Sequence, residues 1–138
     1  MTNAFPSGCH LIQLCVKGDE RGQLVAIEGT SEVPFAIARV YYVFATAPDA
    51  IRGFHAHRAL NQLAVPVAGS CTMVLDDGRG RISVPLDKPA VGLTIGPMIW
   101  HEMSDFSSDC VLMVLANAAY DEGDYIRSYG EFLALART

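Results

Sequence analysis

The feature that most constrains the fold is a series of short β-rich runs, each bounded by clusters of Gly, Pro, Asp or Ser. Such runs at close spacing are typical of strands in an all-β protein. We expect strands at residues 11–16, 23–28, 35–44, 53–57, 62–68, 71–75, 81–86, 91–95 and 110–116. The sequence Asp76-Asp77-Gly78 between two runs predicts a hairpin, because Asp-Gly accepts the positive φ of tight turns.

Only the tail has a helical pattern. Apolar residues recur at Ile126, Tyr129 and Leu133, which predicts a helix over residues 125–136. Pro66 lies inside a run and predicts a bulged or edge strand, since proline cannot donate to the ladder. The expected fold is therefore an all-β jelly-roll barrel with a short C-terminal helix, and such a barrel can enclose a small-molecule pocket.

Composition narrows the class of protein. The 138 residues fit a single domain spanning residues 1–138, and 51% of them are hydrophobic. The net charge of −5 argues against general affinity for nucleic acid or anionic membrane. No apolar run approaches the roughly 20 residues that span a bilayer, and residues 1–10 lack a signal-peptide pattern, so we expect a cytoplasmic protein.

The four cysteines, Cys9, Cys15, Cys71 and Cys110, form no C-x-x-C pair and lie in apolar segments. Cysteine is among the most frequently buried residues, and disulfides seldom persist in the cytoplasm. We therefore expect four buried free thiols.

The sharpest local feature is His55-Ala56-His57. Alternate residues of a strand share a face, so both imidazoles point the same way. Two histidines aimed into a barrel can bind a metal or relay protons near neutral pH. Alone, the pattern also fits two structural histidines.

This motif lies in a frame that resembles the metal-binding cupin pattern. In that pattern a glutamate follows His-x-His after three or four residues, and a glycine follows after six more. Here those offsets hold Asn61 and Gln62, and then Gly69. A neutral amide is a poor ligand for a divalent cation, so the carboxylate ligand is missing from an otherwise complete frame.

The second half of the cupin pattern carries one further histidine after a proline, and Pro97 and His101 resemble it. A three-histidine metal site from His55, His57 and His101 is one alternative. The other, which we favour, is that His101 is a pocket-wall histidine and that no metal is bound.

Arg39 and Tyr41 share a face of a run that is otherwise nearly all apolar. A buried arginine needs a partner. Arg39 is therefore either salt-bridged or faces the pocket and binds an anion there. Tyr41 is either ordinary core or a hydroxyl that donates to a reacting oxygen.

A resemblance covers nearly the whole chain. Its motifs are DERGQL at 19–24, RVYY at 39–42, RGFHAH at 52–57, GSC at 69–71, LDDG at 75–78, GL at 92–93, WHEM at 100–103, DFS at 105–107, YDE at 120–122 and DYIR at 124–127. Several motifs in this order make the sequence similar to the sugar 3,4-ketoisomerases of the FdtA/QdtA type, the WxcM-like cupins.

The resemblance implies a homodimeric RmlC-like cupin barrel with an exchanged N-terminal strand. It implies conversion of dTDP-4-keto-6-deoxyglucose to the 3-keto isomer without metal or other cofactor. A downstream aminotransferase would then make a 3-amino sugar for a surface polysaccharide, such as an O-antigen or S-layer glycan. No nucleic acid or membrane partner is implied.

The resemblance also assigns roles. His57 would shuttle the proton between C3 and C4 through an enediol, and His55 and Tyr41 would move or donate hydroxyl protons. Arg52 and Arg21 would hold the diphosphate.

Arg39 completes the expected substrate-binding set. The pair Arg21 and His101 resembles the members that give the galacto product, whereas Tyr and Arg occur in those that give the gluco product.

Two alternatives remain open. The first is a metal-dependent cupin enzyme, and the second is a non-catalytic cupin that binds a nucleotide sugar. A 3,5-epimerase is disfavoured, because that family relies on a His–Asp pair rather than on H-x-H.

Overall fold

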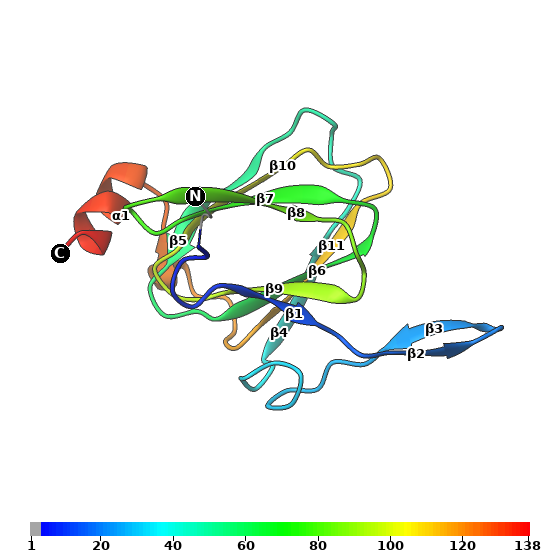
Figure 1. Cartoon of the computed structure of the whole chain (residues 1–138). Coiled ribbons are helices and arrows are strands. Elements are labelled where there is room, and N and C mark those ends of the chain that lie inside the picture. Colours follow the sequence, from blue (N-terminus) through cyan, green and yellow to red (C-terminus); the bar gives the residue numbers. More distant parts are fainter. Residues whose placement is uncertain (1–3) are drawn as a thin grey trace.

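The computed structural model describes residues 4–138, and it consists of two five-stranded antiparallel sheets that face each other (Figure 1). The first sheet has the order β1 (His10–Gln13), β9 (Val91–Ile95), β6 (Gln62–Ala68), β11 (Val111–Ala116) and β4 (Arg39–Val43). The second has the order β12 (Tyr125–Ile126), β5 (Arg52–His57), β10 (Trp100–Ser104), β7 (Cys71–Asp76) and β8 (Arg81–Leu86). The remaining elements are the hairpin strands β2 (Val16–Asp19) and β3 (Gly22–Val25), the 3₁₀ turn η1 (Glu122–Asp124) and the helix α1 (Tyr129–Ala136).

The main core lies between the two sheets. Inward-facing residues such as Met73, Leu75, Leu93 and Leu112 are almost completely buried. Alternate residues of a strand point to opposite faces, so each strand contributes every second side chain to this core. The expected all-β barrel with a short C-terminal helix is confirmed.

The turn at Asp76–Gly78 forms the predicted hairpin between β7 and β8. Asp77 Oδ1 accepts hydrogen bonds from the backbone N–H groups of Arg79 and Gly80 at 2.8 and 2.9 Å. Gly78 has a φ of 92°, a conformation that favours glycine.

Pro66 lies beside a bulge, as predicted. Leu112 pairs with Pro66, but Val111 pairs with Ala68, which leaves Val67 as the extra residue of β6. The bulge lets proline lie within the sheet although it has no N–H to donate.

The helix begins later than the sequence pattern predicts, at Tyr129 rather than at residue 125. Ser128 caps it by accepting the backbone N–H of Glu131 at 3.2 Å. Tyr125 and Ile126 instead form β12, which pairs with His57 and Ala56 of β5.

Three further expectations about strands are corrected. Residues 100–104 form β10, a central strand that the turn-rich sequence around Pro97 does not indicate. The run at 35–44 is a strand only from Arg39, and the stretch at 11–16 is divided between β1 and β2.

The expectation of four buried thiols is wrong for one of them. Cys9, Cys71 and Cys110 are buried, but Cys15 is exposed. Cys15 lies in the link between β1 and β2, where the chain leaves the barrel.

The two ends of the molecule differ in how they pack. Helix α1 covers one end of the barrel, where Phe132 packs against Ala56, Trp100 and Ile126. The β2–β3 hairpin extends away from the barrel on another side (Figure 1), and within the described residues its strands pair only with each other. None of the helices among residues 4–138 is long and apolar enough to cross a membrane.

Candidate active site

Three imidazoles gather at one end of the barrel. His55 and His57 come from β5, and His101 of the neighbouring β10 pairs directly opposite His55. The ring centroid of His55 lies 5.0 Å from that of His57 and 4.6 Å from that of His101. The predicted shared face of the two β5 histidines therefore becomes a three-histidine cluster in the folded chain.

A bulge in β5 sets the position of His55. His101 pairs with His55 but Glu102 pairs with Gly53, so Phe54 is the extra residue. Gly53 and Phe54 have φ values of 94° and 57°. A Cβ on Gly53 would lie 2.7 Å from the carbonyl oxygen of His101, so the close approach of the two strands requires glycine.

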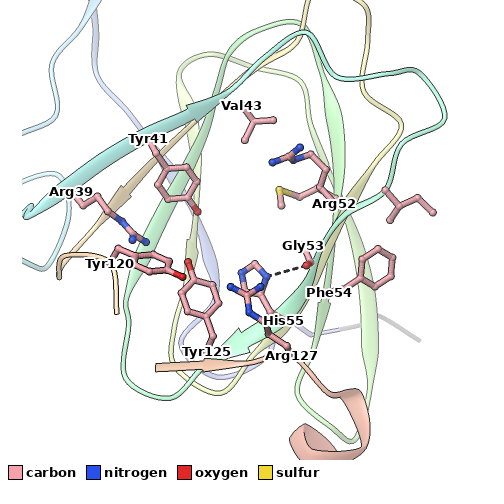
Figure 2. A pocket seen from close by; sticks show the side chains of 12 residues that line it. Arg39, Tyr41, Val43, Arg52, Gly53, Phe54, His55, Tyr120, Tyr125 and Arg127 are labelled. Atoms are coloured by element: carbon pink, nitrogen blue, oxygen red, sulfur yellow. Dashed lines mark hydrogen bonds between the residues drawn. The ribbon is translucent and has the colours of Figure 1, made fainter. Parts of the chain in front are cut away.

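Beside the cluster is an open pocket of about 590 Å³ (Figure 2). Its lining residues are Arg39, Tyr41, Val43, Ile51, Arg52, Gly53, Phe54, His55, Met103, Tyr120, Tyr125 and Arg127. Three arginines and no carboxylate line it, although the chain as a whole is acidic. Such a pocket suits an anionic ligand with rings or hydroxyls that aromatic residues can contact.

The three histidines differ in their access to this pocket. His55 is half-buried and forms part of the pocket wall. His57 and His101 are each only 3% exposed and are not among its lining residues. Only His55 of the cluster therefore contacts the pocket directly.

Burial keeps these imidazoles neutral. Desolvation lowers the pKa of His101 to about 3 and that of His57 to about 4, and neighbouring His55 acts in the same direction on both. The pKa of His55 is also lowered, mainly by burial. Neutral imidazole has one ring nitrogen free to accept a proton, so the cluster is a set of bases at pH 7.

Tyr41 points its hydroxyl into the same region. The hydroxyl donates to Gln62 Oε1 at 3.0 Å, and Gln62 is itself buried. Burial raises the pKa of Tyr41 to about 12, with Tyr125 adding to the effect. Tyr41 therefore stays protonated and can donate a hydrogen bond.

Arg39 lies on the wall of the pocket, and among the described residues it has no salt bridge. Its guanidinium carbon is 5.2 Å from the centre of the Tyr41 ring. Its Nε atom is buried without a hydrogen-bond partner among residues 4–138. Arg39 was expected either to form a salt bridge or to face the pocket, and the structure supports the second alternative.

The carboxyl-terminal tail supplies residues that sequence reasoning did not place in the site. Tyr120, Tyr125 and Arg127 line the pocket, and Asp124 approaches His57. Arg127 lies 4.3 Å from the centre of the Tyr125 ring and forms an ion pair with Glu122 at 2.7 Å. The family motifs at 120–122 and 124–127 contain these residues and could have indicated that this segment belongs to the site.

Six of the seven predicted site residues come together: His55, His57, His101, Tyr41, Arg39 and Arg52. Arg21 does not join them. It lies in the turn of the β2–β3 hairpin, its side chain is 84% exposed, and it forms an ion pair with Asp19 at 2.7 Å.

The cluster is also the one group among the described residues with the spacing of a metal site. One ligand atom from each histidine lies within 4.8 Å of the others. Three neutral imidazoles could hold a divalent ion, as in known three-histidine sites. Gln62, at one of the two offsets where the cupin frame has a carboxylate, instead accepts the hydrogen bond of Tyr41.

Comparisons with known proteins agree with this geometry. Residues 7–137 match the FdtA family, described as WxcM-like, C-terminal. The TDP-4-oxo-6-deoxy-α-D-glucose 3,4-oxoisomerase of Aneurinibacillus thermoaerophilus is 58% identical over 114 residues, which cover 83% of this chain and 82% of that protein.

Two solved structures are similar over nearly their full length. A His-to-Asn mutant of the 3,4-ketoisomerase QdtA from Thermoanaerobacterium thermosaccharolyticum, in complex with TDP-4-keto-6-deoxyglucose, gives a TM-score of 0.94 at 39% identity, covering 96% of each chain. The TDP-quinovose 3,4-ketoisomerase WlaRB from Campylobacter jejuni gives 0.90 at 44% identity, covering 94% of this chain and 99% of its own.

The barrel, the histidine-lined pocket and these relatives define a class of enzyme, the sugar-nucleotide 3,4-ketoisomerases. Within that class the chain belongs to the FdtA family of WxcM-like proteins. The resemblance found in the sequence motifs is thereby confirmed.

Proposed function

We propose that this enzyme converts dTDP-4-keto-6-deoxy-D-glucose to the dTDP-3-keto-6-deoxy sugar. The observation that carries the proposal is His55, a neutral imidazole on the wall of a pocket that three arginines make cationic. The relative from A. thermoaerophilus is named for this sugar nucleotide, and QdtA binds it.

The reaction moves a carbonyl from C4 to C3 through an enediol. A base must remove the C3 proton, and a proton must be added at C4. The family resemblance assigns this shuttle to His57. Because His55 lines the pocket and His57 does not, we assign the contact with the sugar carbons to His55 and a supporting role to His57.

Tyr41 donates to the oxygen that gains negative charge in the enediolate. Its raised pKa keeps the hydroxyl protonated, and Gln62 holds it in place until a substrate oxygen takes over as acceptor. A fixed donor aimed at developing charge stabilises the transition state more than the ground state.

The arginines hold the diphosphate in this proposal. Arg52 begins β5 beside the bulge, Arg39 has a buried Nε without a partner in the described chain, and both line the pocket. A guanidinium can engage phosphate oxygens in a bidentate manner. Arg127 is a third cation there, shared with Glu122.

Arg21 does not line the pocket of its own chain, so it can contact a bound substrate only in the pocket of a second copy of the chain. The β2–β3 hairpin that carries Arg21 extends away from its own barrel (Figure 1). Within this hairpin the apolar side chains of Val16 and Leu24 are 45% and 57% exposed. We propose a homodimer in which the hairpin is the exchanged N-terminal segment and Arg21 completes the pocket of the partner. In this single chain, β1 itself pairs with β9.

The finer features remain part of the same proposal. Arg21 and His101 favour the galacto configuration at C4, and an aminotransferase would convert the 3-keto product to a 3-amino sugar for a surface polysaccharide. We place the enzyme, as one cupin domain, in the cytoplasm, where nucleotide sugars are made.

The second candidate function is a metal-dependent cupin activity, which the spacing of the three histidines supports. A binding cupin without catalysis is the third.

One experiment separates all three. Chelator-treated protein is incubated with dTDP-4-keto-6-deoxyglucose in D₂O and followed by proton NMR. Formation of the 3-keto sugar without added metal supports the isomerase, and the C4 coupling constant reports galacto or gluco. Turnover only after metal addition favours a metal enzyme, and no turnover in either tube leaves a binding protein.

A further inference from the structure

Asp124, the last residue of η1, has no role in the proposed reaction so far. Its side chain is 17% exposed, and its Oδ2 lies 3.3 Å from Nδ1 of His57. Its Oδ1 accepts the backbone N–H of Ala59 at 2.8 Å, and its carbonyl oxygen accepts that of Arg58 at 2.9 Å. Asp124 is therefore fixed to the end of β5 at several points, with one carboxylate oxygen directed to His57.

In all three imidazoles of the cluster, Nδ1 faces an oxygen atom. Nδ1 of His55 lies 3.0 Å from the carbonyl oxygen of Gly53, and Nδ1 of His101 lies 3.2 Å from that of Ile99. His57 differs, because the oxygen nearest its Nδ1 belongs to a carboxylate from another element, at 3.3 Å. This pair is a close contact between polar groups, and neither ring nitrogen of His57 completes a hydrogen bond among the described residues.

Which ring nitrogen carries the proton is set by the hydrogen bond that the other nitrogen makes. A carboxylate near Nδ1 favours the Nδ1–H tautomer and leaves the lone pair on Nε2. With backbone carbonyls doing the same for His55 and His101, the cluster presents three Nε2 lone pairs.

His55 and His57 line different cavities, which share Arg39 and Tyr125 in their walls. His55 lines the large pocket, whereas His57 and Asp124 line a second cavity of about 250 Å³. Asp124 lines the second cavity and not the pocket proposed for the sugar, so we infer that it does not contact the reacting atoms.

We propose that Asp124 is a positioning residue that holds His57 in the Nδ1–H tautomer, so that Nε2 of His57 is an acceptor beside His55. The role rests on the proposed isomerase function, but the tautomer does not depend on it.

The test is Asp124→Asn. Because the N–H of Ala59 retains the amide oxygen at the Oδ1 position, the amide NH₂ faces Nδ1 of His57 and reverses its tautomer. We expect kcat to fall by about 10- to 100-fold with KM within twofold, the range found for groups that orient a functional histidine. Asp124→Glu, which keeps the carboxylate, should recover part of the loss.

Asp121→Asn is the matched control. Asp121 lies in the same loop and lines the same second cavity, but its Oδ1 accepts the N–H of Gly123 at 3.0 Å, a cap that asparagine preserves. We expect kcat within twofold of wild type.

Nitrogen-15 NMR of the histidine rings gives a readout without substrate. The proposal predicts a protonated Nδ1 on His57 in the wild-type enzyme and a protonated Nε2 in Asp124→Asn. A wild-type His57 protonated at Nε2, or an Asp124→Asn enzyme with wild-type kcat, overturns it. If the wild-type enzyme turned over no substrate, the proposed function would fail, and the two spectra would still decide the role of Asp124.

Discussion

The histidine end of the barrel and the β2–β3 hairpin are built in opposite ways. In the first, His57 and His101 are 3% exposed and are enclosed by β5, β10 and β12 of the same chain. In the second, every residue of β2 is exposed, and the one salt bridge of Arg21 among residues 4–138 is with Asp19, two residues before it. The proposed catalytic residues therefore lie in a part that is enclosed by strands of one chain, whereas the hairpin pairs with no other strand among the described residues. In the proposed dimer, Arg21 of this hairpin would reach the pocket of the partner.

The largest expected effect comes from the first region. His55→Asn should lower kcat by about 10²- to 10⁴-fold, because the group that contacts the C3 proton is lost. His57→Asn should cost less, about 10- to 100-fold, since His57 acts through His55. Steady-state kinetics of both variants measures the difference, and TDP affinity by calorimetry serves as the control for binding. A greater loss in His57→Asn would return the shuttle to His57.

The next effect concerns the hydroxyl beside the cluster. Tyr41→Phe should lower kcat by about 10²- to 10³-fold, as expected for loss of one donor to an oxyanion. The ring and its contact with Arg39 remain, so the melting temperature should change little. An unchanged kcat would make Tyr41 a core residue.

Complementation between two defective chains tests the proposed role of the β2–β3 hairpin. Arg21→Ala should reduce kcat/KM roughly tenfold, a loss of about 1.4 kcal/mol of transition-state binding. A purified heterodimer of Arg21→Ala and His55→Asn chains would then contain one complete site if Arg21 serves the partner.

Its activity should be about half that of the wild-type dimer, because one of the two symmetric sites is intact. Activity no higher than that of the Arg21→Ala homodimer would place Arg21 outside the partner's site.

The smallest expected effect is on how the free energy of unfolding depends on pH. His101 has a pKa of about 3 in the folded chain against an ordinary value of 6.5, so between these values the unfolded chain binds more protons. The free energy of unfolding should therefore fall as pH drops from 6.5, by at most about 1.4 kcal/mol per pH unit for this histidine.

Urea unfolding at pH 7, 6 and 5 measures this slope. His101→Gln should make it shallower, because the buried neutral ring is removed. Equal slopes in the wild-type and His101→Gln proteins would show that His101 is not buried as a neutral ring.

Much of the barrel is predictable because strand alternation and turn chemistry are local. The period of two places His55 and His57 on one face, and Asp-Gly predicts the β7–β8 hairpin. Strand β10 is different, because Met98 and the residues before it adopt turn conformations and the segment carries no clear alternation.

The predicted helix over residues 125–136 is wrong at its start for a similar reason. A strand of two residues such as β12 has no periodicity of its own, and Ile126 happens to continue the helical spacing. Ser128 followed by Glu131 three residues later is a capping signal that could have located the start of the helix. Without it, Asp124 and Tyr125 could not be placed beside the histidines, since that proximity depends on long-range pairing with β5.

The central claim is that His55 removes the C3 proton without a metal. The most direct test compares substrate carrying hydrogen or deuterium at C3, using chelator-treated wild-type and His55→Asn enzymes under single-turnover conditions. The account predicts that product formation by the wild-type enzyme is several-fold slower with deuterium, on the order of a primary isotope effect on proton transfer, and that His55→Asn forms product about 10²- to 10⁴-fold more slowly than the wild-type enzyme. Product formation by His55→Asn at a near wild-type rate, with the same isotope effect, would contradict it.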